Sequence, residues 1–188
     1  MNYHVILASN SPRRRELLAG ADIDFEVRVI DGIDECYPHD LPTDQIAGYI
    51  ALKKADAYRA TMNDEELVIT ADTIVVLDGE VMGKPADKED AQRMLRKLSG
   101  NTHQVITGVA LTTLARQHSF SVVTDVTFRQ LSEEEINYYI DHYQPMDKAG
   151  AYGIQEWIGH IGVTAISGSY FNVMGLPVQR IYEALKNF

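Results

Sequence analysis

Apolar and polar residues follow one another along this chain in patterns that predict alternating strands and helices. Residues 3–8 (YHVILA) and 25–30 (FEVRVI) have the composition of strands. Between them, Ser11 is a suitable N-cap and Pro12 suits the first helical position, so a helix is predicted to begin there. The chain therefore opens as strand, turn, helix and strand.

The next stretch predicts a long helix followed by a buried strand. Thr43 can cap a helix that reaches about residue 61. Its apolar stripe consists of Ile46, Ile50, Ala57 and Tyr58. Residues 67–77 (LVITADTIVVL) are almost continuously apolar, as in a strand that is covered on both faces. Asp78-Gly79 then predicts a tight turn into a short return strand.

The middle of the chain predicts a helix and a pair of long strands. Asp87 begins the helix and Gly100 ends it. Segments 102–114 and 120–131 are rich in strand-forming residues and are joined by a short polar turn. We therefore expect these two segments to be antiparallel neighbours.

The last third predicts two helices separated by glycine-rich chain. Ser132 and Glu135 form a capping box for the first helix. From residue 147 the glycine content predicts short strands joined by tight turns, and Pro177 begins a terminal helix. The whole pattern predicts an α/β fold on a long mixed sheet.

Composition adds limits on the class of protein. With 188 residues, of which 45% are apolar and 23% charged, the chain suits one domain over residues 1–188. A single cysteine, Cys36, and a start without the features of a signal peptide predict a cytoplasmic protein. Since no apolar run approaches the roughly 20 residues that span a bilayer, we expect no membrane insertion.

The net charge of −10 argues against a broad nucleic-acid-binding surface, because such surfaces collect Lys and Arg against phosphates. A small anionic ligand needs only a local basic pocket. The charge therefore excludes one class of partner and leaves small phosphorylated molecules open.

Three arginines, Arg13 to Arg15, fall in the first turn of the first predicted helix. Cations are unfavourable at this end of a helix unless an anion offsets them. The free backbone N–H groups, the hydroxyl of Ser9 and the forked guanidiniums are the donors that a phosphate needs. An anion site is the favoured interpretation, and a solvated helix face paired with Glu16 is the alternative.

Asp72 is a carboxylate in the middle of the apolar strand, where it requires a cation, a metal or strong donors. It could bind a hard cation or accept a proton from water, or it could belong to a structural ion pair. Thr73 points to the opposite face if the strand is regular. Asp34 and Glu35, just after the second strand, could complete an Mg²⁺ site with Asp72 or could belong to an acidic surface loop.

Three lysines are candidate phosphate ligands. Lys84 stands in a Gly-Lys-Pro turn that lacks the Walker A spacing, so it is either a single phosphate ligand or a surface lysine. Lys53 and Lys54 both flank the apolar stripe of their helix, and the pattern does not choose between them. Neither the histidine spacing of a zinc site nor a G-x-S-x-G nucleophile motif is present.

The stretch SNSPRRRELL resembles the signature S-x-S-P-R-R-x-E-L-L of the Maf family of nucleoside triphosphate pyrophosphatases. The likeness continues through ADTIVVLDGEVMGKP, LRKLSGNTHQVITGVAL, DKAGAYGIQ and GSYFNVMGLP. This resemblance implies an inosine-triphosphatase-like fold, with a long mixed sheet, flanking helices and a central cleft between two lobes. It also implies metal-dependent hydrolysis of nucleoside triphosphates to monophosphate and pyrophosphate, which removes noncanonical or surplus nucleotides.

The resemblance also implies roles for individual residues. Asp72 matches the proton acceptor, and with Glu35 it would hold a divalent metal ion, Mg²⁺ or alternatively Mn²⁺. The matching substrate-binding positions are Ser9, Arg13, Arg14, Lys54, Thr73, Lys84 and Gln155. The usual L-A-x-x-K-A of the second helix is IALKKA here, which leaves Lys53 as an alternative to Lys54.

At the specificity positions Arg13, Thr73 and Gln155, the chain resembles the branch that acts on dTTP and UTP. The expected partner is thus a small nucleoside triphosphate, including modified pyrimidine nucleotides. One alternative is a pyrophosphatase of the 7-methyl-GTP branch, and another is a nucleotide-binding cell-division regulator without turnover. A homodimer is a further expectation that the sequence leaves open.

Overall fold

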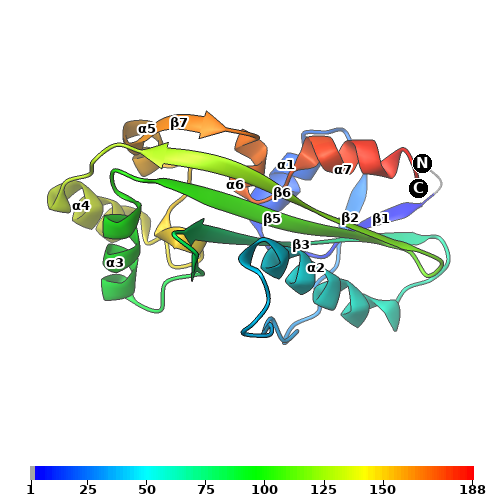
Figure 1. The fold of residues 1–188 in the computed structure, drawn as a ribbon. Coiled ribbons are helices and arrows are strands. Elements are labelled where there is room, and N and C mark those ends of the chain that lie inside the picture. Colours follow the sequence, from blue (N-terminus) through cyan, green and yellow to red (C-terminus); the bar gives the residue numbers. More distant parts are fainter. Residues whose placement is uncertain (1–2) are drawn as a thin grey trace. The chain divides into compact units, whose positions relative to one another are not determined.

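The computed structural model describes residues 3–188 and contains one mixed sheet with helices beside it (Figure 1). The strands follow the order β2-β1-β3-β5-β6-β7, and β4 pairs with β3. Their bounds are β1 His4–Leu7, β2 Phe25–Val27, β3 Glu66–Leu77, β4 Glu80–Met82, β5 Thr102–Thr112, β6 Gln117–Phe128 and β7 Val163–Ser167. Because β1 is parallel to β2 and β3 whereas β4 and β7 are antiparallel to their partners, the predicted α/β fold with a mixed sheet is confirmed.

Seven α-helices and one 3-10 helix lie in the part of the chain that the structure describes. They are α1 Pro12–Ala19, α2 Thr43–Arg59, α3 Lys88–Leu98, α4 Glu133–Tyr143, η1 Ala149–Ala151, α5 Trp157–Gly162, α6 Tyr170–Met174 and α7 Val178–Leu185. Over residues 3–188, no helix combines the length and the apolar character needed to cross a membrane.

The chain divides into two compact units, and the long strands belong partly to each. Unit 1 contains residues 1–73, 107–122 and 175–188, of which the structure describes residues from 3 onward. Unit 2 contains residues 74–106 and 123–174. A single domain with a cleft stays a prediction from the sequence, and each unit is described by itself.

In unit 1, α2 covers one face of the sheet and α1 and α7 cover the other (Figure 1). The buried side chains of α2 include Ile46, Ile50 and Tyr58 from the predicted stripe. The predicted N-cap of α2 is wrong: Pro42 holds the cap position without a side-chain hydrogen bond, and Thr43 is the first helical residue. Asp44 in the first turn gives this end a favourable negative charge instead.

Glycine lets α2 approach the sheet closely. A Cβ atom at Gly108 of β5 would lie 2.3 Å from the backbone carbon of Ala47 and from the backbone nitrogen of Gly48. One helical turn further on, the Thr70 hydroxyl of β3 donates to the Ala51 carbonyl oxygen over 2.7 Å. These two contacts fix the height and the rotation of α2 on the sheet.

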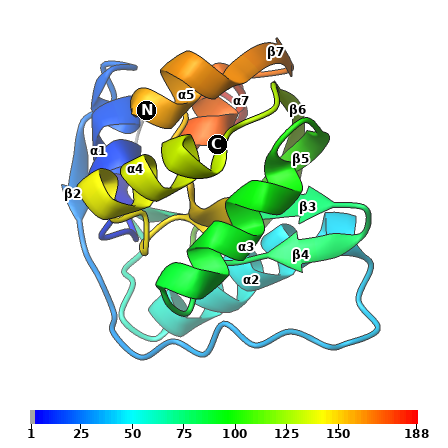
Figure 2. The same ribbon diagram turned by 90° about the vertical axis from the view of Figure 1, so that its left-hand side faces the viewer.

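In unit 2, α3 and α4 lie side by side (Figure 2). Both helices begin at predicted caps, since Asp87 accepts from Asp90 N and Ser132 forms a capping box with Glu135. Arg96 of α3 donates to both carboxylate oxygens of Glu133 on α4, over 2.8 and 2.7 Å. The predicted caps and the bidentate pair together orient the two helices.

The prediction of short strands after residue 147 is largely wrong. Apart from β7, this stretch forms η1, α5 and α6. Its glycines serve close packing: a Cβ at Gly159 would lie 1.9 Å from the Ile154 carbonyl oxygen, and Gly150 has a φ of 68° and packs on Val75. These two glycines therefore allow short helices to pack closely on β3 and on the preceding loop, instead of forming turns between strands.

His103 is a buried histidine in the core of unit 2. Its Nε2 lies 2.7 Å from the Tyr152 hydroxyl, and its ring packs edge-on against Phe128 and Tyr152. Burial lowers the pKa of His103 to about 4. The imidazole is therefore neutral at pH 7, and protonation favours the unfolded chain.

We predict that Gly108→Ala destabilises the protein by at least about 2 kcal/mol, because the added methyl group meets backbone that side-chain rotation cannot move. Denaturant unfolding measures the change. Gly83→Ala is the matched control, since its Cβ would meet nothing within 4 Å. Equal stability of the two variants would contradict the close docking of α2.

We predict that the free energy of unfolding falls by about 2 kcal/mol between pH 7 and pH 5 through His103 alone. The unfolded histidine takes up a proton near its usual pKa of 6.5, whereas the folded one does so only near 4, so stability is lost as pH falls through this window. His103→Gln removes this contribution. If His103→Gln unfolds with the same pH dependence as the unchanged protein, the account of the buried imidazole is wrong.

Candidate active site

The site begins at an interruption in the pairing of β3. β1 pairs with β3 as far as Leu7 opposite Ile69, and β4 pairs with β3 only from Val75 onward. The Ile69 carbonyl oxygen still accepts from Ala8 N, so the Ala71 carbonyl oxygen, two residues later, faces the same edge without a strand partner. A backbone acceptor in this position needs another donor.

Arg14 supplies that donor. Its Nη1 donates to the Ala71 carbonyl oxygen over 2.8 Å, its Nε to the Gly175 carbonyl oxygen over 2.8 Å, and its Nη2 to the Thr73 hydroxyl over 3.1 Å. Burial lowers the pKa of Arg14, and the neighbouring Asp72 carboxylate partly offsets this effect. Arg14 thus joins α1, β3 and the chain before α7 through a single guanidinium.

Lys54 lies between two carboxylates. Its Nζ lies 2.8 Å from Asp72 Oδ1 and 2.9 Å from Glu35 Oε1. The side chains of Lys54 and Asp72 are mostly buried, whereas that of Glu35 is exposed. A helix, a strand and a loop therefore direct one positive and two negative charges to a single point.

Lys53 contacts a different carboxylate. Its Nζ lies 2.6 Å from Asp34 Oδ2 and 3.0 Å from the Cys36 carbonyl oxygen. The bond from Lys53, followed by those from Cys36, holds the pKa of Asp34 well below its usual range. Of the two lysines that the sequence left as alternatives, the structure places Lys54 beside Asp72 and Lys53 on the neighbouring loop.

Asp72 and Thr73 contact helices on opposite faces of β3. Asp72 meets Lys54 of α2, and Thr73 meets Arg14 of α1. The Thr73 hydroxyl also lies 2.9 Å from the Thr107 hydroxyl of β5. Successive side chains of a regular strand point to opposite faces of the sheet, as these two do. Asp72 and Lys54 therefore lie on one face of β3, and Thr73 and Arg14 lie on the other.

The turn before α1 holds the predicted serines. Ser11 is the N-cap and accepts from Arg14 N over 3.4 Å, while Ser9 is buried and accepts from Ser11 N over 3.2 Å. The first turn contains no acidic residue, so Arg13 and Arg15 add positive charge to the positive end of the helix. This end of α1 favours an anion.

Two predicted residues lie in unit 2. Lys84 is exposed in the turn after β4, and Gln155 is half-buried in the loop before α5. Gly150 N donates to the Gly83 carbonyl oxygen over 3.0 Å, so the segments that contain these residues are joined. The Gln155 Oε1 is buried and has no hydrogen-bond partner among residues 3–188.

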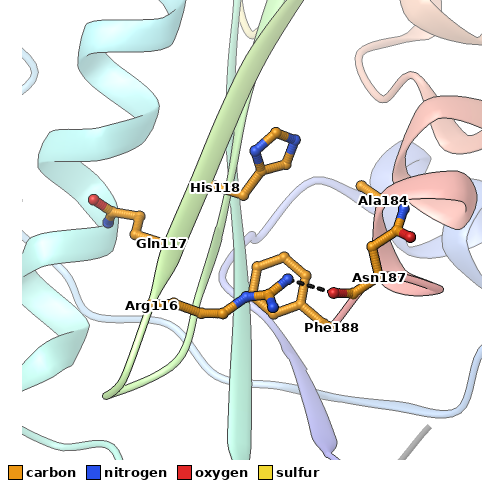
Figure 3. Close-up of a pocket in the computed structure, with 6 residues that line it drawn as sticks. All are labelled: Arg116, Gln117, His118, Ala184, Asn187 and Phe188. Atoms are coloured by element: carbon orange, nitrogen blue, oxygen red, sulfur yellow. Dashed lines mark hydrogen bonds between the residues drawn. The ribbon is translucent and has the colours of Figure 1, made fainter.

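A cavity of about 310 Å³ lies elsewhere in unit 1, between the turn from β5 to β6 and α7 (Figure 3). Arg116 lies over the Phe188 ring there and donates to the Asn187 carbonyl oxygen. None of the predicted site residues lines this cavity, so it does not belong to the candidate site.

The carboxylates beside Lys54 suit a hard cation. Mg²⁺ is usually held by one or two carboxylates and completes its coordination with water and substrate phosphates. Asp72 and Glu35 already direct an oxygen each to one positively charged atom. Among the described residues no group of three or more His, Cys, Asp or Glu could hold a metal, so this pair is a partial ligand set that fits an ion shared with a substrate.

The family model described as Maf-like protein matches residues 4–188. The chain belongs to the Maf family. It is 67% identical over 184 residues to the dTTP/UTP pyrophosphatase of Phocaeicola vulgatus, with 98% of this chain and 95% of that protein covered. It is also 52% identical over 188 residues to the dTTP/UTP pyrophosphatase of Porphyromonas gingivalis W83, with 99% and 94% covered.

Solved structures support the fold of this Maf protein. A HAM1 protein from Coxiella burnetii aligns with 99% of this chain and all of its own, at a TM-score of 0.50 and 16% sequence identity. At that identity the likeness concerns the fold alone. It agrees with the inosine-triphosphatase-like architecture that the resemblance predicted.

Sequence reasoning missed two residues that hold the site of this Maf protein. Gly175 accepts from Arg14 through its carbonyl oxygen and has a φ of 113°, a conformation that favours glycine. Thr107 contacts Thr73 from β5. The Gly-Leu-Pro after α6 signalled a turn, but nothing in the sequence pairs that turn with Arg14, and Thr107 resembles any other strand threonine.

We predict that Arg14→Lys destabilises this Maf protein by about 2–4 kcal/mol, because an ammonium cannot reach all three acceptors and leaves backbone carbonyl oxygens unpaired. Thermal and denaturant unfolding measure the loss. Arg59→Lys is the control, since its contact with Asp56 is an exposed pair within one helix and should change stability by less than about 0.5 kcal/mol. A loss in Arg14→Lys no greater than in the control would show that Arg14 does not anchor β3.

Proposed function

We propose that this Maf protein hydrolyses nucleoside triphosphates, dTTP and UTP above all, between the α- and β-phosphates to a nucleoside monophosphate and pyrophosphate. The names of its relatives support this activity, since proteins 52–67% identical over almost the whole chain are named dTTP/UTP pyrophosphatase. Modified pyrimidine nucleotides and a cytoplasmic location complete the proposal on the strength of the sequence.

The observation that supports the chemistry best is the position of Lys54 Nζ within 2.9 Å of both Asp72 and Glu35. Because the Lys54 ammonium is mostly buried, its positive charge must be balanced by nearby negative charges. The two carboxylates and the ammonium compensate one another while no substrate is present. They also provide both the acidic and the basic groups that a triphosphate and its cation require.

In the proposed reaction, the oxygen of a water molecule attacks the α-phosphorus and the bond from that phosphorus to the bridging oxygen breaks. Asp72 accepts the proton of the water, and pyrophosphate leaves with the bridging oxygen and its electron pair. Lys54 and Arg13 stabilise negative charge on the phosphates. Lys84 and Ser9 are further proposed phosphate ligands.

Asp72 and Glu35 would hold a divalent cation, Mg²⁺ or alternatively Mn²⁺. When bound, such an ion neutralises phosphate charge and makes a coordinated water more acidic. Glu35 is the more exposed of the two, so its loop can adjust as the substrate enters. Asp72 is fixed by its strand and keeps its place for the proton transfer.

Base selection is assigned to Arg13, Thr73 and Gln155, as in the dTTP/UTP branch that the chain resembles. The amide of Gln155 can both donate and accept hydrogen bonds, which suits the edge of a pyrimidine and equally that of guanine, so the pyrimidine preference rests on the resemblance and on the names of the relatives. Its buried Oε1 has no partner in the described part of the chain, so it can accept from a bound base.

We predict that Asp72→Asn lowers the turnover number at least about 100-fold, because the amide cannot accept the proton of the attacking water. Pyrophosphate release from UTP in the presence of Mg²⁺ measures turnover, and an unfolding curve shows that the variant remains folded. Asp56→Asn, an exposed change on α2, is the control and should retain turnover within about twofold. Turnover of Asp72→Asn near that of the unchanged protein would remove Asp72 from the mechanism.

A further inference from the structure

We propose that Tyr139, Lys148 and Glu156 form a clamp that positions Gln155 and thereby sets discrimination between bases. These three side chains, called the Gln155 clamp below, are positioning residues that act through the loop of residues 153–156. The inference rests on the proposed function, since it assigns a structural cause to the selectivity of the same site.

The clamp uses both oxygens of one carboxylate. Tyr139 donates its hydroxyl hydrogen to Glu156 Oε2, and Lys148 Nζ lies 3.1 Å from Glu156 Oε1. The Tyr139 oxygen in turn accepts from Gly153 N over 3.0 Å. The loop that contains Gln155 is therefore held on each side of that residue, at Gly153 and at Glu156.

Two of the clamp side chains are buried, and the third, that of Glu156, is half-buried with 21% of it exposed. Tyr139 is fully buried, and the side chain of Lys148 is only 9% exposed. Burial and the adjacent carboxylate raise the pKa of Tyr139, so its hydroxyl stays protonated and donates to Glu156. Lys148 also contacts the exposed Asp147 over 2.7 Å, which leaves its ammonium between two carboxylates.

The space around Gly153 shows how tightly the clamp closes. A Cβ at this position would lie 2.9 Å from Glu156 Cδ and 3.1 Å from Lys148 Cε. Glu156 N also donates to the Gly153 carbonyl oxygen over 3.0 Å, which closes the backbone turn around Gln155. Few conformations of this loop remain.

The restricted conformation of the loop allows Gln155 to select between bases. A flexible amide can rotate to exchange its oxygen and nitrogen, and it would then suit several bases. A fixed loop directs the buried, unpartnered Oε1 to one place. A base with a donor there, such as uracil with its N3–H, is then favoured over one with an acceptor at that position, such as cytosine with its N3, which is left unpaired. When the loop is rigid, the single hydrogen bond between Gln155 and the base can therefore discriminate between bases.

The test uses Tyr139→Phe, which removes one oxygen and keeps the buried ring. We expect the ratio of kcat/KM for UTP to kcat/KM for CTP to fall about tenfold, the effect of losing one well-placed hydrogen bond. The turnover number with saturating UTP should stay within about threefold, because the phosphate-binding groups are unchanged. Hydrogen exchange of the Gly153 amide should become at least tenfold faster.

Three further variants complete the test, two as matched controls and one as a second disruption of the clamp. Tyr138→Phe removes the hydroxyl of the adjacent, exposed tyrosine on α4 and should change neither readout, because that hydroxyl makes no hydrogen bond within residues 3–188. Glu156→Gln keeps an acceptor for Lys148 and a polar group for Tyr139, whereas Glu156→Ala removes both. Glu156→Gln should preserve most of the selectivity, whereas Glu156→Ala should lose as much selectivity as Tyr139→Phe does.

Each outcome decides a separate point. Unchanged exchange at Gly153 in Tyr139→Phe would overturn the clamp itself. Faster exchange with unchanged selectivity, or an equal loss of kcat/KM for every nucleotide, would overturn its positioning role. If the unchanged protein released no pyrophosphate from any nucleotide, the proposed function would fail, and hydrogen exchange together with the relative binding of UTP and CTP would still test the clamp.

Discussion

The candidate site depends on one backbone carbonyl that no neighbouring strand pairs, that of Ala71, between the segments of β3 that pair with β1 and with β4. Without a donor this oxygen would destabilise the strand at the point where Asp72 must be held. Arg14 supplies the donor and uses its other nitrogens to fix Gly175 and Thr73. An arginine at the positive end of a helix, unfavourable in isolation, is thus stabilised by acceptors from the strand and from the chain before α7.

The same strand links this anchor to the proposed chemistry. One residue beyond Ala71, the side chain of Asp72 contacts Lys54, whose helix is held close to the sheet by Gly108. A shift of α2 would therefore move the ammonium away from the two carboxylates. In unit 2, buried hydrogen bonds fix the loop of Gln155 in a comparable way. Both candidate groups therefore lie beside residues that make hydrogen bonds of their own, an arrangement that helps a site to keep its geometry during binding.

Sequence reasoning succeeded where a residue's neighbours along the chain determine its state. Periodicity and caps located most elements, and a carboxylate within an apolar strand required a charged partner, which Asp72 has in Lys54. It did not succeed where contacts between segments far apart in the sequence determine a residue's partners. Lys53 and Lys54 differ only in how α2 is rotated on the sheet, the acceptors of Arg14 come from remote chain, and the glycines after residue 147 pack short helices instead of turning strands. The roles of the individual site residues remain proposals.

The most direct test of the proposed function measures the release of pyrophosphate from a panel of UTP, dTTP, CTP, GTP, ITP and 7-methyl-GTP, each with Mg²⁺ and with EDTA. Release is expected to require the metal and to be fastest with UTP and dTTP. Release that is fastest with 7-methyl-GTP or ITP would contradict the proposed specificity. Absence of release from every nucleotide would contradict the hydrolytic function and favour a nucleotide-binding protein without turnover.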